Sequence, residues 1–265
     1  MNFFNIDCHV SVIEDIKTIF NDLGHTIDSK NISYHNWVFG RTTDKIDVLQ
    51  NWMELDEDIC ERFYLEYKDE LSKYDGFVVT YPPSFSLLYE KFNKPIIIVA
   101  PIRYEMPFSH RENLDDWKNF NSFLTNKIDN NLVIPITNNL YDKQYCETFT
   151  NRQWKHIPSL CEYTNLKYTG TRNEILLYLS PRAKNSAYLK NGQNTLDNLN
   201  QEGKGNVSDN TWQNLYSYKA AVHVPYNVST MTMFEQKTAG LPLIFPSIDY
   251  MMSKSWPEVL GELYH

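Results

Sequence analysis

The stretch KAAVHVPYNVSTMTMFEQKTAGLPLIFPS, residues 219–247, decides the fold class. A short apolar run at residues 220–224 predicts a strand that ends before a proline. Polar turn residues follow, and a helix is predicted over residues 229–239, with Gly240 at the position of a helix C-cap. Residues 241–245 predict a second strand. Two short strands joined by a helix indicate a parallel crossover unit, and therefore a parallel sheet.

The start of this helix has the chemistry of an anion site. Ligands of parallel sheets bind at the carboxyl ends of the strands, near helix N-termini, where free N–H groups and the helix dipole favour a phosphate. The hydroxyls of Ser229, Thr230 and Thr232 lie at that start. Glu235 follows about one turn later, where a carboxylate can accept hydrogen bonds from a pair of sugar hydroxyls. The alternative is a plain crossover unit with capping hydroxyls and a solvated Glu235.

The stretch FEQKTAGLPLIFPS and the polar turn before it resemble the C-terminal domain of GT-B glycosyltransferases. The resemblance covers residues 219–247 and implies that the diphosphate of a nucleotide sugar binds at 229–232. It also implies that Glu235 binds the ribose. Many retaining members carry a second Glu where this chain has Asn227, so the resemblance favours inversion. It implies a nucleotide-sugar substrate, no cofactor and no metal, with Asn227 in the donor set.

Composition sets the class of protein. A length of 265 residues fits one large domain or two small ones, and 42% hydrophobic residues suffice for an ordinary core. A net charge of −8 argues against a broad nucleic-acid surface. The four cysteines show no CxxC spacing and are expected to be reduced. With no signal peptide and no apolar run near the roughly twenty residues of a membrane span, we expect a cytoplasmic protein.

Strands and helices are predicted to alternate along the whole chain, which indicates an α/β fold with doubly wound parallel sheets. Ser11 and Glu14 have capping-box spacing before a helix over residues 12–23. A helical region over residues 46–71 is expected to break near Asp56. The predicted strands are residues 3–10, 25–28, 76–80, 96–100, 132–137 (an edge strand, because of Pro135), 154–158 and 175–179, and further helices are predicted at 84–92, 114–128, 140–149 and 211–218.

We therefore predict two Rossmann-like domains with a cleft between them, as the resemblance implies. The first covers residues 1–162 and faces the acceptor, and the second covers residues 173–265 and binds the nucleotide sugar. The polar segment 163–172 is predicted to be the linker, and residues 185–210 to be weakly structured. The resemblance further implies that a final helix over 248–264 crosses back to the first domain.

Arg182 and Lys184 follow the first predicted strand of the second domain. The leaving diphosphate develops negative charge, and metal-independent GT-B enzymes neutralise it with basic residues and helix N–H groups. We therefore expect Arg182, and next to it Lys184, to bind phosphate. The alternative is a solvated basic loop.

Asp7, His9 and Ser11 are expected at the carboxyl end of the first strand. Sugar transfer to a hydroxyl needs a base, and His9 or Asp7 can take that proton because imidazole titrates near neutral pH and a carboxylate can act or orient it. Ser11, His35, Trp37 and Arg103 form the predicted acceptor site, since aromatic faces suit sugar rings. The alternatives are a capped strand end and ordinary surface packing.

Other sites and functions are less well supported. The acidic clusters Asp56-Glu57-Asp58 and Asp115-Asp116 are expected on helix faces, so neither is the Asp-x-Asp that metal-dependent sugar transferases carry at a strand end. The histidines are too dispersed for a zinc site, and no GxGxxG or P-loop pattern occurs. A nucleotide-sugar epimerase is the rival enzyme, and it would form product from the donor alone. A non-catalytic nucleotide- or sugar-binding module is the other rival. The acceptor stays open between a glycan, a small molecule and a modified base.

Overall fold

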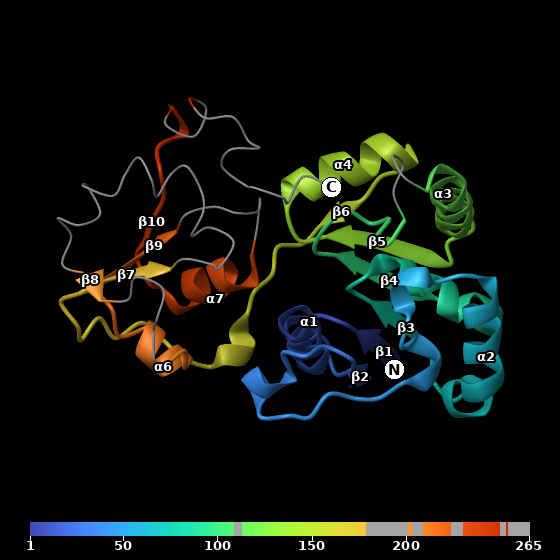
Figure 1. Ribbon diagram of the computed structural model, residues 1–265, viewed down its shortest axis with the longest axis horizontal. Coiled ribbons are helices and arrows are strands. Elements are labelled where there is room, and N and C mark those ends of the chain that lie inside the picture. Colours follow the sequence, from blue (N-terminus) through green and yellow to red (C-terminus); the bar gives the residue numbers. More distant parts are fainter. Residues whose placement is uncertain (109–112, 179–200, 203–208, 224–229, 250–252, 254–265) are drawn as a thin grey trace. The chain divides into compact units, whose positions relative to one another are not determined.

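The computed structural model describes residues 1–108, 113–178, 201–202, 209–223, 230–249 and 253. The chain divides into two compact units, Met1–Ser159 and Leu160–His265. Each unit contains a parallel sheet with helices, which confirms the predicted α/β class (Figure 1).

The first unit is built on a six-stranded parallel sheet with the order β2-β1-β3-β4-β5-β6 (Figure 1). Its strands are β1 (Asn2–Asp7), β2 (Thr26–Asn31), β3 (Gly76–Val79), β4 (Ile96–Ala100), β5 (Val133–Thr137) and β6 (Lys155–His156). Its helices are α1 (Val10–Asp22), α2 (Glu57–Leu71), α3 (Leu114–Asp129) and α4 (Leu140–Thr150), with 3₁₀ segments η1 (Asn36–Phe39), η2 (Asp47–Leu49), η3 (Trp52–Glu54) and η4 (Pro83–Phe92).

The helices of this unit lie on both faces of the sheet. The chain leaves β1 toward β2 in one direction, and from β3 onward it advances in the other. Right-handed crossovers then put α1 on one face and the remaining helices on the other. The core follows this division, because Phe3 and Val78 pack with α1 while Phe4 and Phe77 pack with α2, η4 and α3. Alternate residues of one strand thus serve opposite faces.

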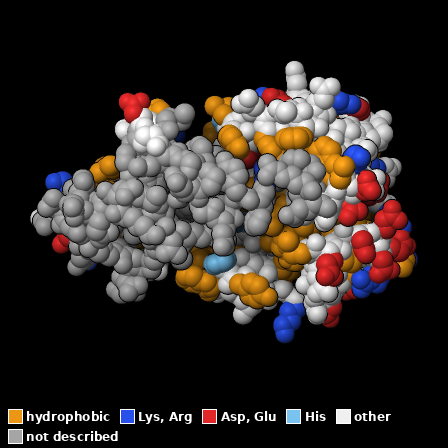
Figure 2. All heavy atoms as spheres, turned by 45° about the horizontal axis from the view of Figure 1, so that its top comes forward, with side chains coloured by type: hydrophobic (Ala, Val, Ile, Leu, Met, Phe, Trp, Pro, Cys, Tyr) orange, Lys and Arg blue, Asp and Glu red, His pale blue; other side chains and the backbone are white. Residues whose placement is uncertain are grey.

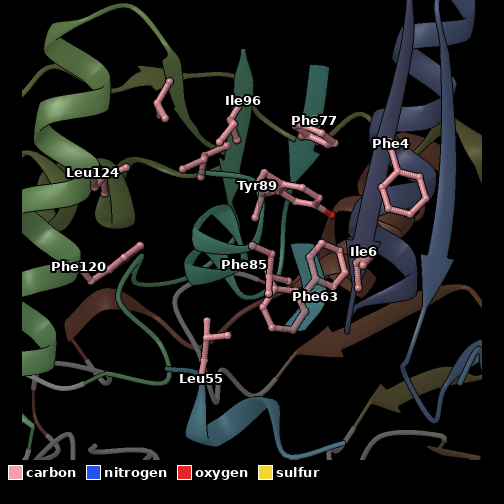
Figure 3. Close-up of a cluster of buried hydrophobic side chains, with 14 of the residues drawn as sticks. Phe4, Ile6, Leu55, Phe63, Phe77, Phe85, Tyr89, Ile96, Phe120 and Leu124 are labelled. Atoms are coloured by element: carbon pink, nitrogen blue, oxygen red, sulfur yellow. The ribbon is translucent and has the colours of Figure 1, made fainter. Parts of the chain in front are cut away.

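Aromatic side chains fill the larger core cluster. Phe77 and Tyr89 stack with ring centroids 4.1 Å apart, and Phe63 meets Tyr89 edge to face at 6.0 Å (Figure 3). All three side chains are fully buried. Tyr89 comes from η4 and Phe63 from α2, so the cluster fixes both elements onto β3.

The start of α1 differs from the prediction. The capping box is wrong, because the N-cap is His9 and makes no side-chain capping hydrogen bond. Asp7 accepts the backbone amide of His9, which closes the turn and lets the helix begin at Val10. Glu14 instead bonds Arg41 and Lys17.

Two further predictions need correction. β5 is internal rather than an edge strand. Its neighbour β6 pairs only with Ile136 and Thr137, so Pro135 has a ladder partner on the β4 side alone, where it lies opposite Ile98. The break at Asp56 is confirmed, but the residues before it form the 3₁₀ turns η2 and η3 instead of an α-helix.

The second unit has a smaller parallel sheet with the order β10-β9-β7-β8 (Figure 1). Its elements are β7 (Ile175–Tyr178), β8 (Gln201–Glu202), α6 (Trp212–Leu215), β9 (Ala220–His223), α7 (Met231–Ala239), β10 (Leu243–Ile244) and η5 (Glu162–Thr164). β8 lies in a segment that was expected to be weakly structured. The predicted strand–helix–strand unit is confirmed, and Gly240 ends α7 in the left-handed region at φ 86°. Numbered one to four along the chain and read from β8 to β10, the strands of this sheet have the order 2-1-3-4. This is the order of β2-β1-β3-β4 in the first sheet.

The segment predicted to be a linker packs within the second unit. The amide of Tyr168 donates to the carbonyl of Ala239 at 2.8 Å, and that of Thr169 donates to the carbonyl of Tyr216 at 3.0 Å. Leu166 and Tyr168 also contact the core cluster that includes Leu176 and Tyr216. Of the predicted final helix, Ile248 and Asp249 are helical and the amide of Ser253 donates to the carbonyl of Asp249 at 3.0 Å, whereas the rest lies outside the described residues.

The surface of the first unit carries acidic side chains on one side (Figure 2). Exposed carboxylates of α2 contribute to it, namely Glu57, Asp58, Glu66, Asp69 and Glu70. Among the described residues, no helix has both the length and the apolar character to cross a membrane.

Candidate functional site

The strand order places a topological switch point between β1 and β3. The chain leaves these neighbouring strands toward opposite sides of the sheet, and in open α/β sheets ligands bind at such a point, outside the carboxyl ends of the strands. Cys8 and His9 follow β1 there, and Thr80 and Tyr81 follow β3. The predicted Asp7–His9 pair therefore lies at the preferred ligand edge of the first sheet.

Asp7 holds the two loops of this edge together. It is fully buried, and its carboxylate accepts the amide of His9 on Oδ1 and the amide of Tyr81 on Oδ2, the latter at 3.2 Å. The amide of Cys8 completes the link by donating to the carbonyl of Tyr81 at 2.8 Å. Burial raises the pKa of Asp7 well above its ordinary value, and the amides of His9 and Tyr81 oppose that shift.

His9 presents a neutral imidazole at the same edge. It is the N-cap residue of α1, with extended backbone dihedrals, and its ring meets that of Tyr81 edge to face at 6.0 Å. Its Nδ1 is buried and makes no hydrogen bond with the described part of the chain. Burial, and secondly the charge of His35, lowers the pKa of His9 to about 4. The ring is therefore uncharged at neutral pH.

The loop after β2 is stiffened by buried polar side chains. Asn31 Oδ1 accepts the amide of Ser33 at 2.8 Å, and Ser33 Oγ accepts the amide of His35 at 3.1 Å. Asn36 Nδ2 donates to the carbonyl of Asn31 at 2.8 Å and to that of Thr42 at 3.3 Å. Because β2 pairs with β1 in register, with Asn31 opposite Asp7, this loop lies beside the β1–α1 turn.

The same loop turns aromatic side chains to solvent. Tyr34 is 90% exposed and Trp37 is 64% exposed, and His35 is exposed between them. Arg41 closes the loop onto α1 with a bidentate bond to Glu14, at 2.5 and 3.0 Å. Ser11 is half-buried in the first turn of α1. The predicted acceptor residues Ser11, His35 and Trp37 thus belong to neighbouring segments at one edge of the sheet.

Arg103 belongs to a different group of side chains. It lies in the loop after β4, and its charge acts on Asp142 and Tyr145 of α4. Tyr145 donates to Glu105 Oε1 at 2.5 Å, and Asp142 bonds Asn139. Glu105 and Asp142 are only 3% and 2% exposed. Sequence reasoning missed Asp142, and its only signal is the three-residue spacing from Asn139, the N-cap of α4.

In the second unit, Thr230 and Glu235 both lie on or next to α7. Thr230 is the N-cap, and its Oγ1 accepts the amide of Met233 at 3.3 Å. Glu235 is only 7% exposed. Its Oε1 accepts a hydrogen bond from the hydroxyl of Tyr163, and its Oε2 accepts one from Trp212 Nε1 at 3.3 Å. Glu235 is therefore held in place rather than solvated.

The rest of the predicted donor set, Arg182, Lys184, Asn227 and Ser229, lies outside the described residues. In the part of the chain that is described, no group of three or more His, Cys, Asp or Glu side chains could hold a metal ion. The chain matches no known protein-family model, and no curated protein is significantly similar to it in sequence.

Proposed function

We propose that this chain is a glycosyltransferase of the GT-B type. It moves a sugar from a nucleotide-sugar donor to an acceptor hydroxyl without a metal ion and with inversion at the anomeric carbon. The observation that carries the proposal is the presence of two parallel sheets in one chain, with His9 at the ligand edge of the first and Glu235 on the helix after β9 of the second. The second unit takes the donor, and the first takes the acceptor.

The donor chemistry assigns each end of the nucleotide to a part of the second unit. Glu235 accepts hydrogen bonds from the ribose hydroxyls. The diphosphate lies at the start of α7, where free N–H groups favour an anion, with Ser229, Thr230 and Asn227 nearby in sequence. Arg182 and Lys184 offset the charge that develops on the leaving diphosphate.

His9 is the better candidate for the base. Both oxygens of Asp7 are used by backbone amides, and a change in its protonation would disturb two loops. The neutral ring of His9 has a lone pair ready at physiological pH, although a pKa of about 4 makes it a weak base in the free protein. An anionic donor nearby would favour the imidazolium and raise that pKa toward the working pH. Asp7 then acts through His9 by fixing the turn that carries it.

The acceptor site uses the stiff aromatic loop. Trp37 offers a flat, exposed face on a segment that is already ordered, so binding a sugar ring there costs little conformational entropy. His35 and Ser11 add hydrogen-bonding groups next to it. Arg103 joins them only if the acceptor extends to the loop after β4.

A thermal-shift screen of the full chain tests the proposal. UDP, GDP, ADP and their sugars are added singly, and specific binding should raise the melting temperature by mass action, which corresponds to about 2.7 kcal/mol of stabilisation at a ligand concentration of a hundred times Kd. Donors that bind are then incubated with acceptor mixtures, and products are detected by mass spectrometry. His9→Ala should abolish transfer while donor binding persists.

The other outcomes of this screen are equally informative. If no nucleotide or nucleotide sugar shifts the melting temperature, the proposal is wrong. An isomerised sugar formed from the donor alone would indicate an epimerase. Binding without transfer, hydrolysis or isomerisation, together with tolerance of changes at His9, would indicate a non-catalytic module.

A further inference from the structure

Two aromatic side chains from separate parts of the second unit converge on Glu235. Tyr163 belongs to η5, and Trp212 begins α6, so they lie 72 and 23 residues away from Glu235 in the sequence. Their rings meet edge to face with centroids 5.8 Å apart. One donates from a hydroxyl to Oε1, and the other donates from the indole N–H to Oε2 at 3.3 Å. Each oxygen of the carboxylate thus receives a donor of its own.

This arrangement fixes the plane of the carboxylate. A single hydrogen bond would leave the group able to rotate about its last side-chain bond, whereas donors on both oxygens restrict that rotation. A buried carboxylate needs such donors, because a charge removed from water is costly unless it is hydrogen-bonded. Tyr216, which is 1% exposed, also senses this carboxylate, because burial and secondly the charge of Glu235 raise the pKa of Tyr216.

The chemistry of a carboxylate gives this rigidity a use. An ionised carboxylate is an acceptor only, and it can accept more than two hydrogen bonds. A vicinal diol can donate to both oxygens at once when the carboxylate plane is held at the right angle. Preorganisation of this kind strengthens binding because less freedom is lost when the ligand arrives.

We propose that Tyr163 and Trp212 are positioning residues that orient Glu235 toward the 2′,3′-diol of a ribonucleoside diphosphate, and that they thereby set a preference for ribonucleotides. This inference rests on the proposed function, since it needs a nucleotide in the second unit. Neither aromatic residue has to touch the nucleotide. Each acts through the carboxylate of Glu235.

The test compares paired ligands on the full-length chain. UDP, GDP and ADP are titrated calorimetrically, each beside its 2′,3′-dideoxy counterpart, and the ratio of the two dissociation constants measures the use of the diol. Tyr163→Phe keeps the ring and removes its hydroxyl donor, whereas Trp212→Phe replaces the indole and its N–H donor by a smaller aromatic ring. Loss of a hydrogen bond to a charged group changes a dissociation constant by roughly tenfold. Each variant should therefore lower the preference for the ribonucleotide by about tenfold and leave the affinity for the dideoxynucleotide unchanged.

Tyr168→Phe is the matched control. It removes a tyrosine hydroxyl in the same unit that donates to the carbonyl of Lys219 at 3.0 Å, away from Glu235. Its ratio should equal that of the wild type. Glu235→Gln should lose the preference, and adding Tyr163→Phe to it should change the ratio no further. A merely structural role for the aromatic pair would weaken both ligands of a pair equally.

Three results overturn the inference. In the first, the wild type binds the ribonucleotide better but both Phe variants keep the same ratio, which leaves the proposed function standing. In the second, the wild type binds both ligands of each pair equally well. In the third, no nucleotide binds, in which case the proposed function fails as well. If one Phe variant does not fold, the other variant and the Glu235→Gln pair still decide.

Discussion

Replacement of His9 by Gln should change how the stability of the first unit depends on pH. The imidazole is neutral in the folded protein because burial and the charge of His35 lower its pKa to about 4, whereas an exposed histidine has a pKa of 6.5. Between these two pH values the unfolded chain binds a proton that the folded chain does not. The contribution of the neutral His9 to the free energy of unfolding is therefore fully present above pH 6.5. It is lost as the pH falls toward the folded-state pKa.

The size of the effect follows from the two pKa values. Their difference, 6.5 − 4, multiplied by about 1.4 kcal/mol for each pH unit, gives about 3.5 kcal/mol once both states are protonated. Between pH 7.5 and pH 5 the same linkage predicts a loss of about 2 kcal/mol from His9 alone. Gln has no charge to gain, so the variant should lack this part of the pH dependence.

The measurement must report on the first unit alone. We suggest urea titrations at pH 7.5, 6 and 5, read by pulsed hydrogen exchange and mass spectrometry on peptides from β1 and β3. Asp7 keeps the same backbone donor in the variant, because it bonds the amide of residue 9 and not its side chain. Its own titration therefore largely cancels in the difference between the two proteins. His25→Gln, at the amino end of β2, controls for the introduced glutamine.

Parallel pH profiles for the wild type and His9→Gln would refute this reasoning. They would mean that the ring is solvated or protonated in the folded protein. The assignment of His9 as a neutral base would then lose its physical basis. The conclusion would be the same if the pH profile of His25→Gln differed from that of the wild type while the profile of His9→Gln did not.

Three other substitutions test local features of the structure. Gly76→Ala should destabilise the first unit by about 1–3 kcal/mol in urea unfolding, because the new Cβ would lie 2.7 Å from the carbonyl oxygen of Pro95; full stability would show that β3 can shift. Asp56→Ala should cost about 1 kcal/mol by the same assay, since Asp56 accepts the amide of Ile59 at 2.8 Å as the N-cap of α2, while Asp56→Asn should cost much less. Trp37→Ala should change stability by less than about 0.5 kcal/mol but raise the KM for the acceptor, and an unchanged KM would remove it from that site.

The elements that were predicted well have strong local signals. Residues 96–100 are an apolar run between prolines, β-branched at the first four positions, and β4 covers the same residues. Gly240 was expected to end a helix, and it does so in a conformation that suits glycine. In both cases neighbouring residues alone determine the structure.

Features that depend on distant residues could not be predicted. Pro135 predicts an edge strand because proline lacks an amide donor, yet β5 is internal. The proline is tolerated because β6 is too short to pair with Pro135. Ser11 and Glu14 have the spacing of a capping box, but Arg41 binds Glu14 from the loop after β2. Long-range partners decided both cases.

The candidate site shows the same limit. Asp7 was predicted at the carboxyl end of the first strand, but its bond to the amide of Tyr81 joins residues 74 apart. The polar sequence around Tyr163 predicts a linker, although its hydroxyl bonds Glu235. Residue type and local pattern identified the carboxylates. Their partners required the tertiary structure.

A lowered histidine pKa does not by itself identify a base, and this chain provides the comparison. Burial lowers the pKa of both His9 and His223, and both lie at the carboxyl ends of parallel strands. His223 Nε2 bonds Oε1 of the fully buried Gln236, and its ring stacks on Phe245 at 5.5 Å. Such contacts make it part of the packing between β9 and α7. In the part of the chain that the structure describes, the buried Nδ1 of His9 makes no hydrogen bond, and the residue lies beside a loop that exposes aromatic side chains. This difference in surroundings is the reason to propose His9, and not His223, as the base.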